Sequence, residues 1–190
     1  MMIKIKKKLL YTLLILPALI FLLFPTLFDL LGPRPWKTLL VNGGYCTLSF
    51  LILSLALAPL SKHFPKLKGL YPHRRAIGVT VFFYASFHLL SVLMKTYEKK
   101  GEIPLDYFLR PVVYTGLGAF LILLLLTLTS NNWSVRTLGY SNWKGIHRFV
   151  YGAELLVFIH LALQSLPLAL SFFVPLVFLQ LLRIKYRREF

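Results

Sequence analysis

Long apolar runs recur along the whole of this 190-residue chain. A helix needs about 20 predominantly apolar residues to cross the hydrocarbon core of a bilayer, and hydrophobic residues make up 57% of the sequence. A soluble globule of this size could not cover so much apolar surface. The sequence therefore predicts an all-α polytopic membrane protein, a six-helix transmembrane bundle that forms one domain over 1–190. The predicted spans are about 9–31, 38–60, 76–94, 112–130, 146–166 and 168–183.

The first apolar run follows a cluster of lysines and so has the general form of a signal peptide. Its core, from Leu9 to Leu31, is longer than the core of a signal peptide, and no small-residue cleavage site follows it. We interpret this run as the first span. The single cysteine, Cys46, lies within an apolar run and has no second cysteine to pair with, so an intramolecular disulfide is excluded.

Charge predicts the orientation of the chain. The formal net charge is +16, from 22 Lys and Arg residues against 6 Asp and Glu. With a cytoplasmic N-terminus, most of these cations lie in cytoplasmic segments, as the positive-inside rule requires. We therefore predict both termini in the cytoplasm, with the cations facing anionic lipid head groups. No soluble module is predicted that could present this charge to nucleic acid.

Three histidines lie within the apolar runs: His88, His147 and His160. An ionisable ring in hydrocarbon is costly without a partner, so intramembrane histidines indicate a functional site. His88 follows Arg75 by thirteen residues, and His160 follows His147 by the same spacing, which is about 20 Å along a helix. His88 and His160 are therefore expected at one depth, in the outer half of the membrane. Two such rings on separate helices favour a bis-histidine heme b.

His147 is expected near the cytoplasmic face. Its spacing from His160 places the two rings about 140° apart around an ideal helix, so both face the third span only if the first turn is frayed or distorted. Gly145 permits such fraying. Arg74 or Arg75 occupies the matching position of the third span, so a second bis-histidine heme would lack a histidine ligand there. The alternative for each histidine is a structural hydrogen bond to a carbonyl or hydroxyl of a neighbouring helix.

Other residues of the spans have weaker signals. Gln164, one turn beyond His160, is a candidate partner for the outer nitrogen of that ring or for a heme propionate. Glu154 is the only acidic residue deep in a predicted span, where it could relay a proton or make a structural hydrogen bond. Gly78, Gly116 and Gly118 permit close approach of a backbone or a porphyrin, although close helix packing alone would explain them.

Several motifs are shared with a known family. They are the Arg74-Arg75 pair followed by Gly78 and His88, the Leu-Thr-Ser end of the fourth span, and Leu138-Gly139 followed by Trp143, His147 and Tyr151. On these residues, the segment from about Arg74 to His160 resembles the ferric-reductase-like transmembrane family. Within that family it is similar to the heme-binding membrane subunits of periplasmic methionine sulfoxide reductase systems. The family pattern has leucine where this chain has Ile146.

The resemblance implies an electron conduit in a bacterial inner membrane. Heme b and FMN would carry electrons from the quinone pool or a cytoplasmic flavin reductase to a periplasmic molybdopterin methionine sulfoxide reductase, in which the catalysis resides. His88, His160 and His147 would then bind heme iron, and Arg74 and Arg75 would hold heme propionates or a flavin phosphate. Oxidase-type relatives use four histidines for two stacked hemes, whereas this chain supplies three in its membrane core.

Two alternatives remain open from the residues alone. Arg74 and Arg75 could instead anchor lipid phosphates. The whole chain could also be a heme-free small transporter or membrane assembly scaffold, in which the histidines pair with polar groups.

Overall fold

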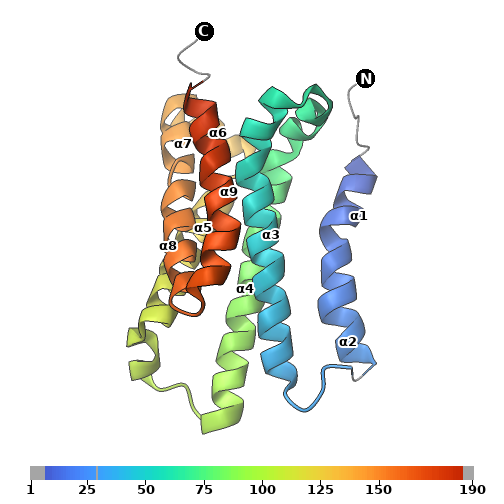
Figure 1. The fold of residues 1–190 in the computed structure, drawn as a ribbon, viewed down its shortest axis with the longest axis vertical. Helices are drawn as coiled ribbons and strands as arrows, with labels where there is room; N and C mark the ends of the chain where they lie inside the picture. The colour runs from blue at the N-terminus through green and yellow to red at the C-terminus, as the bar shows by residue number, and fades with distance from the viewer. Residues whose placement is uncertain (1–6, 29, 186–190) are drawn as a thin grey trace. The chain divides into compact units, whose positions relative to one another are not determined.

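The computed structural model describes residues 7–28 and 30–185, and throughout those ranges every regular element is a helix (Figure 1). Four helical stretches are long and apolar enough to cross a membrane, and a shorter apolar helix covers Leu166–Leu181. The predicted all-α polytopic membrane fold is confirmed, while the count of six spans stays a prediction. The four stretches are Leu9–Leu27, Pro35–His63, Pro65–Lys100 and Pro111–Leu128.

The chain divides into two compact units. The first extends from the N-terminal helix to Ile103 and includes the end of the last helix from Leu179, and the second is Pro104–Phe178. The prediction of a single transmembrane domain over 1–190 stays a prediction.

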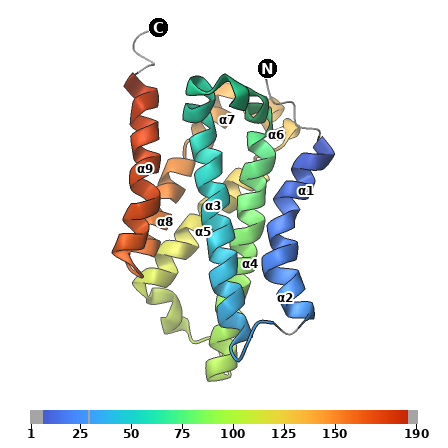
Figure 2. The same ribbon diagram turned by 45° about the vertical axis from the view of Figure 1, so that its right-hand side comes forward.

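The first unit is built on an antiparallel hairpin of α3 (Pro35–His63) and α4 (Arg74–Lys100), which lie side by side in Figures 1 and 2. Pro35 begins α3 at a position where a missing N–H costs nothing. The basic segment between the two helices forms a 3-10 helix, η2 (Pro65–His73). α4 extends beyond the predicted 76–94 and ends at Gly101, whose φ of 75° provides the left-handed C-terminal cap.

The N-terminal span is a broken helix. α1 (Lys7–Ala18) passes into a π-helix, η1 (Leu19–Leu23), and then into the short α2 (Phe24–Leu27). Pro17 lies inside α1 and has no N–H to give to the carbonyl of the preceding turn. Because hydrocarbon offers no hydrogen bonds, the backbone groups freed by such a break need partners from neighbouring helices.

Tyr84 of α4 supplies one of these partners. Its hydroxyl accepts a hydrogen bond from the Ala18 N–H (2.9 Å) and donates one to the Leu14 carbonyl (2.9 Å). An uninterrupted α-helix would join these two groups directly, so the tyrosine hydroxyl is inserted into the backbone ladder of α1. Asn42 of α3 supplies a second partner, since its amide donates to the Phe21 carbonyl of η1 at 3.0 Å.

Apolar packing completes the attachment of the first span. A cluster of Leu10, Leu14, Leu57 and Ile77 joins α1 to the end of α3 and the start of α4. A second cluster, near the other end of the hairpin, contains Leu22, Leu31, Leu39, Cys46 and Tyr84. The ring of Phe50 packs against both clusters and stacks on Tyr84, with ring centroids 5.2 Å apart.

The second unit begins with η3 (Leu105–Leu109) and α5 (Pro111–Leu128), and α5 packs against α8 (Val150–Ala162). Between them, the polar segment that follows α5 forms two short helices, α6 (Asn132–Leu138) and α7 (Tyr140–His147). The Asn131 side chain caps α6 by accepting from the Ser134 N–H at 2.7 Å, which is the usual role of asparagine at a helix start. α9 (Leu166–Lys185) contacts α8 through Phe158 and Phe173.

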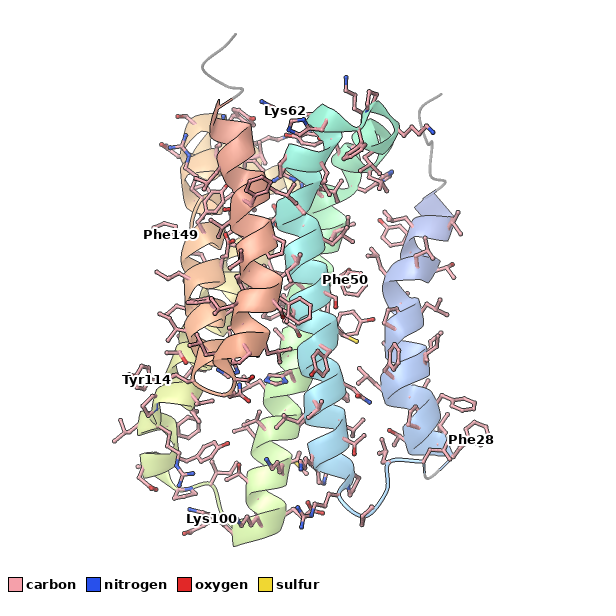
Figure 3. All side chains as sticks on the ribbon, in the orientation of Figure 1. Phe28, Phe50, Lys62, Lys100, Tyr114 and Phe149 are labelled. Carbon is pink, nitrogen blue, oxygen red and sulfur yellow. The ribbon has the colours of Figure 1, made fainter. Side chains whose placement is uncertain are left out.

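Large apolar side chains point outward from both units. Figure 3 labels Phe28, Tyr114 and Phe149, which project away from their helices and are each more than half exposed. Soluble proteins do not expose apolar side chains in such numbers. These faces therefore fit contact with lipid, as the sequence predicts.

Replacing Tyr84 with phenylalanine tests the attachment of the first span. The variant Tyr84→Phe keeps the ring stacked on Phe50 but loses both hydrogen bonds to α1, and hydrogen bonds in membrane proteins are worth about 0.6 kcal/mol on average. We expect the free energy of unfolding in detergent to fall by about 1 kcal/mol. The exposed Tyr45→Phe is the control. A Tyr84→Phe protein as stable as Tyr45→Phe would contradict the bridging role.

Candidate functional site

His88 is held against α3 in a defined orientation. Its Nδ1 lies 2.8 Å from the Leu40 carbonyl oxygen. A carbonyl can only accept, so Nδ1 carries the proton and donates it, and the lone pair of the neutral ring is on Nε2. Gly44 flanks the same ring, because a Cβ at that position would be 3.1 Å from both Nδ1 and Cε1. The ring therefore occupies the space of the missing side chain.

His160 has the same arrangement in the second unit. Its Nδ1 donates to the Val112 carbonyl at 2.7 Å, and a Cβ at Gly116 would be 2.8 Å from Nδ1. Each ring bonds a carbonyl 48 residues earlier in the chain, and in each case the glycine follows that carbonyl by one helical turn. We call these two arrangements the histidine sockets: Leu40, Gly44 and His88, and Val112, Gly116 and His160.

The predicted neighbour of His160 is also in place. The Gln164 amide nitrogen lies 3.1 Å from Nε2 of His160, as expected for an amide N–H donating to the lone pair. Gln164 is exposed, so its side chain can move away from the ring at low cost. The prediction that Gln164 reaches the outer nitrogen of His160 is confirmed.

His147 is held differently from the other two histidines. Its Nε2 lies 3.3 Å from the Thr129 hydroxyl at the end of α5, and the Trp143 ring packs 4.1 Å from it, centroid to centroid. The single hydroxyl hydrogen of Thr129 has a nearer acceptor in the Leu125 carbonyl, at 2.8 Å. Nε2 of His147 is therefore oriented to donate to that hydroxyl. A hydrogen bond to a hydroxyl of another helix is what we expect of a histidine with a purely structural role.

A distortion separates His147 from His160. α7 ends at His147 and α8 begins at Val150, and the linking turn is tightened by bonds from the Arg148 and Phe149 N–H groups to the Gly145 and Ile146 carbonyls. These are three-residue steps, as in a 3-10 helix. The helix that carries the two histidines is therefore broken just after His147. This is the turn in which the sequence requires a distortion if both rings are to face the third span.

Arg74 and Arg75 begin α4 in the first unit. The guanidinium of Arg74 lies 5.0 Å from the centroid of the Tyr71 ring. Its Nε is buried and makes no hydrogen bond within the part of the chain that the structure describes. A buried N–H without an acceptor is rare, and an anionic oxygen is the natural partner for a guanidinium. Arg75 is exposed.

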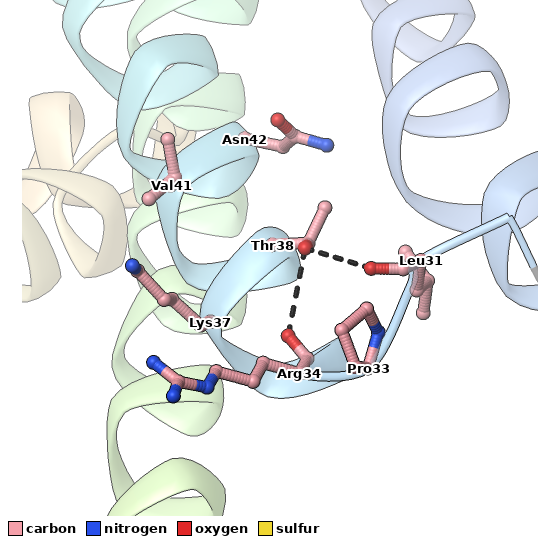
Figure 4. A pocket seen from close by; sticks show the side chains of 7 residues that line it. All are labelled: Leu31, Pro33, Arg34, Lys37, Thr38, Val41 and Asn42. Carbon is pink, nitrogen blue, oxygen red and sulfur yellow. Dashed lines mark hydrogen bonds between the residues drawn. The ribbon is translucent and has the colours of Figure 1, made fainter.

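An open pocket lies at the start of α3, and no residue of the histidine socket of that hairpin lines it. It has a volume of about 520 Å³ and is lined by Leu31, Pro33, Arg34, Lys37, Thr38, Val41 and Asn42 (Figure 4). Two of its polar side chains already have partners, since the Thr38 hydroxyl donates to the Leu31 carbonyl and Asn42 donates to η1. The pocket contains none of the predicted site residues.

Sequence reasoning anticipated part of the sockets. The three histidines were identified by their place in apolar runs, and Gly116 by its capacity for close approach. Gly44 and the two acceptor carbonyls were missed, because nothing in the sequence says which carbonyl a ring will reach. The repeated spacing of glycine and histidine in the two hairpins was the available signal. Among residues 7–28 and 30–185, no three His, Cys, Asp or Glu side chains gather as a bare metal ion would need.

The chain belongs to a family that is described as the ferric reductase like transmembrane component, whose model matches residues 43–159. This match includes Gly44, His88, Gly116 and His147, and it ends one residue before His160.

Comparison with individual proteins shows which members of the family this chain is similar to. The chain is 38% identical over 136 residues to the protein-methionine-sulfoxide reductase heme-binding subunit MsrQ of Azospira oryzae, covering 70% of this chain and 57% of the relative. It is 35% identical to MsrQ of Herminiimonas arsenicoxydans, covering 71% and 62%. It is also 36% identical to the magnetosome protein MamZ of Magnetospirillum gryphiswaldense, covering 64% of this chain and 19% of MamZ. The match thus spans about three fifths of the MsrQ relatives. No solved structure matches significantly.

Proposed function

We propose that this protein carries electrons across a bacterial inner membrane by means of heme b. The observation that supports it most strongly is the pair of histidine sockets. In each, the Nδ1–H bond to a helix carbonyl fixes the tautomer in which Nε2 bears the lone pair. Histidines that bind metal characteristically donate their other ring N–H to a carbonyl or carboxylate in this way.

His88 and His160 are the proposed axial ligands of one heme. Each ring contacts the N-terminal part of its neighbouring helix, α3 for His88 and α5 for His160. Both of these helices are expected to start at the same membrane face, which supports equal depth for the two rings. When bound, heme supplies a one-electron couple whose potential depends on its axial ligands. To bind iron through Nε2, His160 must release Gln164.

The cytoplasmic side of the site is proposed to hold a second cofactor contact. The buried Nε of Arg74, which has no hydrogen-bond acceptor among the described residues, is suited to an anionic oxygen of a heme propionate or of FMN phosphate. Arg75 and His147 are the other proposed contacts. His147 would have to release the Thr129 hydroxyl before its Nε2 could bind iron.

The proposed direction of transfer follows from charge and from the relatives. Electrons would enter at the cytoplasmic side from the quinone pool or a cytoplasmic flavin reductase. They would leave to a periplasmic MsrP-like molybdopterin reductase, because the MsrQ relatives are named as subunits of a methionine sulfoxide reductase. This chain is then an electron-transfer subunit, and substrate reduction takes place in the partner. A heme-free transporter or assembly scaffold is the second candidate, and buried Glu154 is the observation that favours it.

Removing either proposed axial ligand should abolish low-spin heme. The detergent-purified protein should have the sharp Soret band of bis-histidine heme b, and His88→Ala or His160→Ala should lose it, because one histidine cannot fill both axial positions. His63→Ala, at the end of α3, is the control. A wild-type protein without a heme spectrum would support the heme-free candidate. Full low-spin heme in His88→Ala would reject the ligand assignment.

The cytoplasmic cofactor contact can be separated from a structural role of His147. We expect Arg75→Ala and His147→Ala to slow reduction by the quinone or flavin donor. Cofactor retention should weaken about tenfold or more, since a charge-assisted hydrogen bond is worth about 1.5–3 kcal/mol. The low-spin spectrum of the outer heme should be retained. Thr129→Val removes the hydroxyl partner of His147 but leaves its ring in place. If Thr129→Val slows reduction as much as His147→Ala does, the role of His147 is structural.

The orientation can be measured by labelling single cysteines in a Cys46→Ala background. Lys68 of η2 and Glu102 are both exposed and lie at opposite ends of α4. We expect a membrane-impermeant maleimide to label Glu102→Cys in intact spheroplasts and Lys68→Cys only after lysis. The reverse pattern would invert the proposed electron path.

A further inference from the structure

Two glycines give the histidine rings access to the helix backbone. In an α-helix, the carbonyl of one residue is flanked by the side chain one turn later, since residues four apart lie on the same face. Gly44 follows Leu40 by that distance, and Gly116 follows Val112. With no side chain at these positions, the carbonyls are open to a donor from the neighbouring helix, and the ring N–H of each histidine takes that place.

A methyl group at either glycine would crowd the histidine ring, more severely at Gly116 than at Gly44. A Cβ at Gly116 would lie 2.8 Å from Nδ1 and 2.9 Å from Cε1 of His160, closer than real contacts allow. A Cβ at Gly44 would lie 3.1 Å from the same two atoms of His88, which is tight but less severe. The ring would have to turn or shift, and the hydrogen bond from Nδ1 would lengthen as it did so.

Other glycines of the same hairpins lack this relation to a ring. A Cβ at Gly43 would meet the backbone and Cβ of His88 and the Phe87 ring at 3.4–3.5 Å, which is ordinary contact. A Cβ at Gly118 would meet only the Leu156 side chain, at 3.2 Å. Close packing of helices therefore accounts for Gly43 and Gly118. Packing alone does not explain why an imidazole ring, and not some other side chain, fills the space at both Gly44 and Gly116.

We propose that Gly44 and Gly116 are positioning residues, which set the rotation and the Nδ1–H bond of the two heme ligands. This inference rests on the proposed heme-binding function. A carbonyl that accepts a hydrogen bond from Nδ1–H increases the basicity of Nε2. The more basic ring stabilises ferric iron, so each socket lowers the heme reduction potential and strengthens heme binding. Neither glycine needs to touch the heme to exert this effect.

The test compares Gly44→Ala and Gly116→Ala with their neighbours Gly43→Ala and Gly118→Ala. Each purified protein is titrated with heme, its reduction potential is measured by spectroelectrochemistry, and its low-spin ferric electron paramagnetic resonance spectrum is recorded. We expect Gly116→Ala to weaken heme affinity about 10- to 100-fold, the usual effect of losing the partner of a metal ligand. The remaining heme should have a raised potential and an altered low-spin signal. Gly44→Ala should change in the same direction by less.

The controls should retain the wild-type potential and spectrum. If Gly116→Ala does not accumulate in the membrane, Gly44→Ala is the variant that decides, because the contacts of the added methyl group are milder at Gly44. The inference is overturned if Gly44→Ala and Gly116→Ala match the wild type. It is also overturned if Gly43→Ala and Gly118→Ala shift the potential as much, since that would indicate general helix packing. In either of these cases, a wild-type protein with a normal heme spectrum still supports the proposed function. A wild-type protein without heme would overturn the proposed function and this inference together.

Discussion

Hydrocarbon forms no hydrogen bonds, and this constraint governs every polar group in the spans of this protein. A carbonyl or ring N–H that leaves its usual partner must find another inside the bundle. The structure meets this need by exchange between helices: Tyr84 and Asn42 satisfy the broken first span, and the Leu40 and Val112 carbonyls accept from histidine rings. The same kind of bond, between a side chain of one helix and the backbone of another, therefore both attaches the first span and orients the candidate ligands.

This coupling makes histidine orientation a property of the hairpins. Each ring is fixed by a carbonyl and a glycine on one neighbouring helix, within one unit of the chain. A hairpin can therefore prepare its own ligand before any cofactor arrives. Such preparation reduces the ordering cost of binding, as it does for other preorganised metal sites.

The sequence was sufficient for the class of fold but not for its irregularities. Apolar length identified the helices of α3, α4 and α5, because a span leaves a long, unambiguous run. It could not place the ends: Glu98 and the lysines beside it are polar, yet α4 continues through them to Gly101. The segment before His147 is polar, yet it contains two short helices: Asn131 caps α6, and Gly139 separates α6 from α7. Caps of this kind depend on local hydrogen bonds that hydropathy does not record.

For the candidate site, the sequence identified the residues and the structure distinguished between them. The sequence distinguishes His147 from His88 and His160 only by its depth in the predicted spans. The structure separates them by which nitrogen is bonded: Nδ1 faces a carbonyl in His88 and His160, whereas Nε2 faces a hydroxyl in His147. Only the first arrangement directs the lone pair of Nε2 away from the backbone. In the proposed heme site, Nε2 is therefore the nitrogen that His88 and His160 would offer to iron. His160 would first release the exposed Gln164 side chain, and His147 would first release the Thr129 hydroxyl.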